Sequence, residues 1–101
     1  MTVKLVALWS TPNDVEGFEK DYGSIHLPLV AAIPGLKGAV ASKALDGKYY
    51  RMAELLFDDA ESMASALGSP EAAKLLADAG RLQEAFGATV DVLTVEELAK
   101  I

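Results

Sequence analysis

The stretch Phe18–Val30 reads FEKDYGSIHLPLV and contains His26, the only histidine of the chain. Tyr22 follows Phe18 by four residues, and His26 follows Tyr22 by four. Residues at this spacing lie on one face of an α-helix, so the three rings form one stripe. Pro28 weakens the later turns, which predicts a kink or an irregular turn near His26. The rest of the chain is organised around this helix.

Strand patterns surround the helix on both sides. The segment before it is apolar at nearly every position, with Lys4 as its only charge, which predicts a central strand. Asp46-Gly47 is a strong hairpin signal between two later segments, the first of which has a polar side typical of an edge strand. The predicted strands are Thr2–Trp9, Leu36–Leu45, Tyr49–Phe57 and Ala88–Val95.

Capping patterns predict where the helices begin and end. Asn13 with Glu16, and Asp58 with Glu61, match the reciprocal cap in which a side chain satisfies the free amides of the first turn. Ser69 followed by Pro70 is a second kind of helix start. The predicted helices begin after Asn13, run from Ala60 to Leu67, and run from Pro70 to about Phe86 with an interruption at Gly80 before Gly87 ends the region.

The element order β-α-β-β-α(α)-β over residues 1–101 predicts a single ferredoxin-like α+β domain with a four-stranded antiparallel sheet. Its helices cover only one face of the sheet. The first strand is nevertheless apolar at both parities, with Leu5 and Ala7 on one face and Val6 and Leu8 on the other. Large apolar sheet faces are rarely left in water. We therefore expect a homodimer, in which a second copy covers the open face.

Composition excludes several classes of function. The net charge of −6 and the pI near 4.6 argue against nucleic acid or an anionic membrane as partner. The chain lacks cysteine and any apolar segment long enough to span a bilayer, so a cytoplasmic location is expected. One histidine and no cysteine argue against a zinc site, and no glycine-rich phosphate loop is present. We therefore expect no cofactor.

Several motifs occur in an order that resembles the EthD family of dimeric α+β barrel proteins. They are F-x3-Y-x3-H-x-P-L-V, the following P-G-L, the hairpin D-G-K-Y-Y, the strand A-E-L-x-F and the late S-P-E, and they extend the match from about Val3 to Val95. The resemblance implies paired sheets and a small-molecule pocket between sheet and helices. Relatives act as cofactor-independent isomerases, dehydratases or monooxygenases on small cyclic or aromatic compounds. The family histidine matches His26, its helix aromatic matches Tyr22, and its proline matches Pro28.

His26 and Tyr22 are the candidate catalytic residues. A histidine in a pocket can exchange a proton at neutral pH, although its ring can also hydrogen-bond a backbone carbonyl and hold the helix end in place. Tyr22 can orient the histidine or merely pack. Glu54 lies inside an apolar strand, where a carboxylate is solvated, paired with Lys4, or functional. The candidate ligand-binding residues are Trp9, Phe18, Tyr49, Glu54 and Phe86.

Three functions remain open at this point. The first is a cofactor-independent isomerase, dehydratase or monooxygenase acting on a small apolar or aromatic molecule. The second is a dimer that binds such a molecule without chemistry, and the third is a dimer with an interaction role whose pocket is filled by side chains. Haem, with His26 as an axial ligand, is a further alternative.

Overall fold

A four-stranded antiparallel sheet forms one layer of the molecule. The computed structural model describes residues 1–101, and the strand order in its sheet is β2-β3-β1-β4. The first strand is therefore central and the second lies at an edge, as predicted. The strands are β1 (Val3–Trp9), β2 (Gly38–Lys43), β3 (Arg51–Phe57) and β4 (Val90–Glu96).

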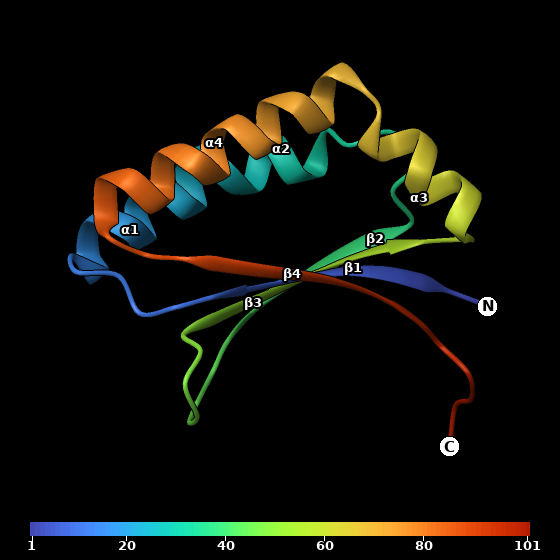
Figure 1. The fold of residues 1–101 in the computed structure, drawn as a ribbon, viewed down its shortest axis with the longest axis horizontal. Coiled ribbons are helices and arrows are strands. Elements are labelled where there is room, and N and C mark those ends of the chain that lie inside the picture. Colours follow the sequence, from blue (N-terminus) through green and yellow to red (C-terminus); the bar gives the residue numbers. More distant parts are fainter.

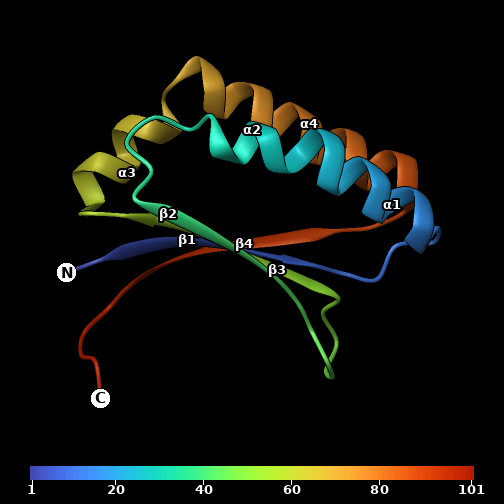
Figure 2. The ribbon, with the colours of Figure 1, turned by 180° about the vertical axis from the view of Figure 1, so that it is seen from behind.

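The helices form a second layer on one face of this sheet. Figures 1 and 2 show α4 beside the first helical region, with both above the same face and the opposite face uncovered. The ferredoxin-like α+β fold predicted from the element order is thus confirmed. The helical segments are α1 (Val15–Asp21), a π-helical turn η1 (Tyr22–His26), α2 (Leu27–Ala31), α3 (Ala60–Leu67) and α4 (Pro70–Phe86).

Two helix caps differ from the prediction by one residue. Asp14, rather than Asn13, caps α1, because its carboxylate accepts a hydrogen bond from the Gly17 amide at 3.0 Å. Asp59, rather than Asp58, caps α3 in the same way, with the Ser62 amide at 2.7 Å. The capping carboxylate must directly precede the first helical residue to reach the free amides, and the sequence pattern does not resolve that position.

The later helix and the hairpin also differ in detail from the prediction. Helix α4 continues through Gly80 without the predicted interruption, because good helix formers surround this glycine. Ser69 caps α4, and Gly87 ends it with a left-handed φ of 63°, as predicted. The hairpin between β2 and β3 has a longer loop than a two-residue turn, with Gly47 at a φ of 83°. The two strands are correspondingly shorter than predicted.

The core between sheet and helices has two parts. One is an aromatic cluster in which Trp9, Phe18 and Tyr22 pack with Leu82. The other is aliphatic and contains Leu55 among its buried residues. The buried space between these clusters is where the candidate site lies.

No helix combines the length and the hydrophobicity that a bilayer-spanning segment requires.

Candidate functional site

A single π-helical turn sets the position of His26. In η1 the Leu27 amide donates to the Tyr22 carbonyl five residues earlier, one residue further than in an α-helix. Pro28 follows immediately and has no amide hydrogen, and its ring would collide with the carbonyl of Ser24 in a regular α-helix. The wider turn avoids this collision, and such turns occur often at functional sites. The irregular turn predicted near His26 is therefore present.

The π turn also changes which side chains face the core. The α-helical pattern predicts Ile25 on the apolar face, yet its side chain is 43% exposed. Tyr22 and His26 do point inward, as their shared stripe predicts, with exposures of 1% and 6%. Their rings stack with centroids 5.2 Å apart, and the Trp9 ring meets the imidazole edge-on at 5.8 Å. The imidazole is thus held between two aromatic side chains.

Asp78 on α4 holds one nitrogen of this imidazole. Nδ1 of His26 lies 2.9 Å from Oδ2 of Asp78, and both side chains are buried. The second carboxylate oxygen, Oδ1, accepts from Nε of Arg81 at 2.7 Å. Arg81 in turn donates to Asp21 at 2.8 Å, at the end of α1. The four side chains connect the histidine turn to α4 through hydrogen bonds.

Burial and the carboxylate have opposite effects on His26. Burial lowers the pKa of the imidazole below its ordinary value and outweighs Asp78, which raises it. Burial raises the pKa of Asp78, but hydrogen bonds from Arg81 and His26 outweigh burial and leave that pKa below the ordinary value. Asp78 is therefore ionised at neutral pH and can only accept. His26 is then neutral, with its hydrogen on Nδ1 and a lone pair on Nε2.

An apolar cavity of about 190 Å³ lies beside His26. Its wall comes from the helices on one side and from β1, β3 and β4 on the other, and it includes Trp9 and Val30. Apart from the indole N–H of Trp9, the polar side-chain groups of the wall are those of His26 and Gln83. Gln83 is already occupied, because it donates to the Ala79 carbonyl and accepts from the Val90 amide. Nε2 of His26, which has no protein partner, is left as the basic group of the cavity.

The cavity opens between α4 and β4. Leu76 and Val92 both line it and are 65% and 55% exposed, so they form an apolar rim. Gly80 also borders the cavity, and a Cβ added there would meet no atom within 4 Å. The solvent-facing rim of the His26 cavity is therefore apolar and uncrowded.

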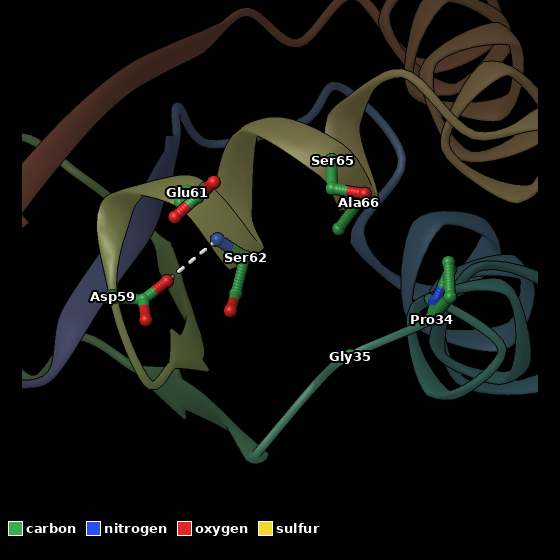
Figure 3. Close-up of a pocket in the computed structure, with 7 residues that line it drawn as sticks. All are labelled: Pro34, Gly35, Asp59, Glu61, Ser62, Ser65 and Ala66. Atoms are coloured by element: carbon green, nitrogen blue, oxygen red, sulfur yellow. Dashed lines mark hydrogen bonds between the residues drawn. The ribbon is translucent and has the colours of Figure 1, made fainter.

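A larger hollow elsewhere on the surface lacks comparable chemistry. It measures about 410 Å³ and lies between the Pro34-Gly35 turn and α3 (Figure 3). Its wall carries the carboxylates of Asp59 and Glu61, and Asp59 is the cap of α3, bonded to the Ser62 amide. The hollow is shallow and polar and contains no buried ionisable group, so the His26 cavity is the better candidate despite its smaller volume.

The structure brings together only some of the predicted site residues. Tyr22 stacks on His26 but does not line the cavity. Its buried hydroxyl has no protein partner, and burial raises its pKa, so the phenol stays neutral at pH 7. Nothing in the structure shows the hydroxyl bonded to the imidazole. Tyr22 is placed to hold the ring of His26 rather than to exchange protons with it.

Of the five predicted ligand-binding residues, Trp9 alone lines the cavity. Phe18 and Phe86 pack against each other at 6.0 Å, outside the cavity. Tyr49 lies in the hairpin loop, where its hydroxyl donates to Asp91 at 2.8 Å. Glu54 faces the open side of the sheet and forms an ion pair with Lys4 at 3.3 Å. Of the three roles considered for this carboxylate, the structure therefore shows pairing with Lys4.

Asp78 and Arg81 were missed by the sequence analysis. Asp78 follows Leu75 by three residues and precedes the buried Leu82 by four, so it belongs to the apolar stripe of α4. A carboxylate on such a stripe needs a buried partner, so the position of Asp78 in the sequence indicates a buried polar pair. The partner, however, lies 52 residues earlier in the chain, and no local pattern identifies it.

The donor groups of the chain do not form a metal centre. No three His, Cys, Asp or Glu side chains converge in a way that could hold a metal ion. The cavity wall likewise carries no cationic side chain for a phosphate-bearing cofactor.

Comparison with known proteins identifies the family of the chain. The model of the EthD domain matches residues 11–84. An uncharacterised 11.0 kDa protein encoded between thcB and thcC in Rhodococcus erythropolis is 32% identical over 99 residues, covering 93% of this chain and 94% of that protein. An EthD family protein from Bacillus halodurans has a crystal structure with a TM-score of 0.89 at 30% identity, covering 97% and 100% of the two chains.

A more distant likeness concerns the fold alone. SnoaB, a cofactor-independent oxygenase from Streptomyces nogalater, superposes with a TM-score of 0.73 at 15% identity, covering 99% of this chain and 96% of that chain. The family model covers most of the chain, and the two relatives above are at least 30% identical over nearly the whole of both chains. The chain therefore belongs to the EthD family.

Proposed function

We propose that this protein performs acid–base chemistry on a small, mostly apolar molecule, with His26 as the proton acceptor and donor. One observation carries the proposal. Nε2 of His26 is the only basic side-chain atom in the wall of an apolar cavity, while Asp78 holds Nδ1 at 2.9 Å. This arrangement presents a lone pair of fixed orientation to whatever molecule enters.

The cavity favours one chemical class of ligand. A neutral imidazole with its hydrogen on Nδ1 accepts a hydrogen bond at Nε2, so the ligand has to present an O–H, N–H or acidic C–H group. The remaining wall is apolar, so the body of the ligand is apolar as well. A cavity of about 150 Å³ is known to hold benzene, and the volume here is about 190 Å³. Phenols and enols of one ring meet these conditions.

The proton transfer is balanced within the site. The proton leaves the ligand for Nε2, which makes His26 an imidazolium and the ligand an anion. Asp78 then stabilises the imidazolium, as the carboxylate partner of a histidine base does in other enzymes. Return of the proton to another ligand atom completes an isomerisation, and its delivery to a leaving hydroxyl completes a dehydration. The same electron-rich anion is a substrate for oxygenation when dioxygen is the co-substrate.

The likeness to a cofactor-independent oxygenase supports a reaction that requires no bound cofactor. Within this proposal Asp78 is a positioning residue, because it acts on the ligand only through His26. Tyr22 is also a positioning residue, because it stacks on the imidazole with ring centroids 5.2 Å apart and does not line the cavity. A protein that binds such a molecule without converting it is the alternative function.

NMR titration of His26 tests the proposal, since the chain has only this histidine. Phenol, a small enol lactone and a quinone are added in turn, and turnover of each binder is measured. We expect a phenol or enol to shift the His26 ring signals, and His26→Ala to abolish turnover. Binding without product supports the non-catalytic alternative. If no member of the panel perturbs His26, the site does not bind this class and the proposal is wrong.

We further propose that the protein is a homodimer formed through the open face of the sheet. By the strand register, Val6, Leu8, Met52 and Leu93 share this face, and Leu93 is 43% exposed. The Lys4–Glu54 pair lies among them, and such an apolar face with a central ion pair suits an isologous contact.

Sedimentation analysis tests the dimer. Leu93→Lys is expected to convert the dimer to a monomer, because it places a charge in the proposed contact. Leu67→Lys on α3 is the matched control, since Leu67 is similarly exposed at 40% but lies on the helical layer. A monomeric wild-type protein at micromolar concentration contradicts the proposal.

A further inference from the structure

A second apolar hollow lies behind the cavity of His26. It measures about 220 Å³, and every residue of its wall is hydrophobic. It occupies the space between α2 and the edge strand β2, on the same face of the sheet but near the opposite edge from the α4–β4 opening. Its own wall residues are Leu27, Ala31, Ala39, Val40 and Ala41.

The two cavities share a wall. Val30, Ala53 and Leu55 line both of them. Ala53 and Leu55 belong to β3 and form the floor, whereas Val30 belongs to α2 and faces the sheet from the helical layer. Val30 is 6% exposed and lies one helical turn after His26, on the same face. The Val30 side chain therefore stands beside the imidazole, at the point where one cavity ends and the other begins.

Valine forms a stiff partition. A β-branched side chain has one strongly preferred rotamer in a helix, so Val30 cannot turn aside as a Leu or Met side chain can. The small side chains of Ala39 and Ala41 leave the space behind it empty. Drug-sized pockets measure about 300–1,000 Å³, so one cavity suits a single ring and only the two together suit a longer molecule.

We propose that Val30 is the residue that determines ligand length in this protein. It confines the ligand to one ring with a short substituent at His26, and the hollow behind it is a latent site for an uncharged alkyl extension of that ligand. The extension is apolar because no polar side chain lines the second hollow. This inference rests on the proposed function, because it takes the head group of the ligand to bind at His26.

A series of phenols with 4-alkyl chains of increasing length tests the proposal. Dissociation constants of phenol, 4-ethylphenol and 4-hexylphenol are measured from the His26 ring signals. Each methylene that becomes buried tightens binding about fourfold. In the wild-type protein, 4-ethylphenol is expected to bind more tightly than phenol by this factor for each buried methylene. The affinity of 4-hexylphenol is expected to show no further gain, because the longer chain meets Val30.

Val30→Ala is expected to tighten 4-hexylphenol at least tenfold and to leave phenol within about twofold. Adding Ala41→Leu to this variant fills the second hollow and is expected to remove the gain. Val3→Ala is the matched control, since Val3 is equally buried at 5% but lines neither cavity. It should leave the whole affinity series unchanged.

Val30→Ile is the test variant to use if Val30→Ala does not fold. The added methylene narrows the first cavity, so 4-ethylphenol is expected to bind at least fourfold more weakly while phenol is little affected. The inference is overturned if neither variant changes the ratio of long-chain to short-chain affinity. If phenol binds at His26 and this ratio stays constant, only the role of Val30 is wrong. If phenol never perturbs His26, the proposed function is wrong and this inference falls with it.

Discussion

Asp78→Asn removes the carboxylate that connects His26 to Arg81, with almost no change in side-chain volume. The carboxylate accepts two hydrogen bonds, at 2.9 Å from His26 and at 2.7 Å from Arg81. An asparagine side chain has one acceptor oxygen and one donor nitrogen, so it cannot accept both. If its oxygen serves Arg81, its NH₂ group faces Nδ1 of His26. The imidazole must then move its hydrogen to Nε2, and the lone pair in the cavity is lost.

The cost in stability follows from the burial of each bond. Both side chains of the His26–Asp78 pair are less than a tenth exposed, and a buried hydrogen bond to a charged group contributes about 1.5–3 kcal/mol. Arg81 is 39% exposed, so solvent screens its bond, which contributes at most about 1 kcal/mol. We therefore expect Asp78→Asn to lower the free energy of unfolding by about 2–4 kcal/mol. Loss of the negative charge also lowers the pKa of His26 further.

Urea denaturation measures the stability, and ¹⁵N NMR of the imidazole measures its tautomer and pKa. Asp91→Asn is the matched control, because Asp91 is exposed and bonds only the Tyr49 hydroxyl at 2.8 Å. It makes the same change of charge and is expected to alter stability by less than about 0.5 kcal/mol. If Asp78→Asn leaves stability, tautomer and pKa as they are in the control, the buried pair does not orient His26 and the reasoning is refuted.

The remaining predictions concern pH, helix α4 and the π turn. The folded state lowers the pKa of His26 below its unfolded value of about 6.5, so stability is full above that pH and falls as the pH drops below it. Denaturation midpoints between pH 5 and 7 should show this slope, and His26→Gln should remove it. Gly80→Ala should raise the free energy of unfolding by about 0.4–1 kcal/mol, because the new methyl group meets no atom within 4 Å; a lower denaturation midpoint would contradict this. Pro28→Ala should let the π turn relax towards an α-helix and displace His26. NMR would detect this as loss of the hydrogen bond at Nδ1. An unchanged imidazole would show that Pro28 does not cause the π turn.

Local patterns predicted the elements of this fold well because each element depends on nearby residues. Periodicity identified the central strand β1, and the Ser69-Pro70 and Gly87 signals located both ends of α4. Errors of one residue arose at Asp14 and Asp59, where two adjacent polar residues compete for the capping position. These errors leave the fold unchanged, because either residue places the helix on the same face of the sheet.

The site was predicted less completely, because its parts come from distant segments. The sequence marks His26 as the only histidine of the chain and places it on an aromatic stripe, and it marks Pro28 as the source of an irregular turn. It does not show that the turn is π-helical, which is why Ile25 is exposed instead of buried. It also does not show whether Tyr22 bonds the imidazole or stacks on it, since both arrangements are compatible with a four-residue spacing.

The sequence by itself therefore determined the order of the elements, the irregular helix at His26 and the family of the chain, because propensity, capping and motif order act over a few residues. Tertiary structure decided which nitrogen of His26 is free, because Asp78 reaches Nδ1 only when α4 packs beside the histidine turn. It also decided that a cavity exists, because the space beside Trp9 and Val30 depends on how two core clusters pack against each other. A hydrogen bond or an empty volume between segments 52 residues apart has no local signature, and only the folded chain brings its parts together.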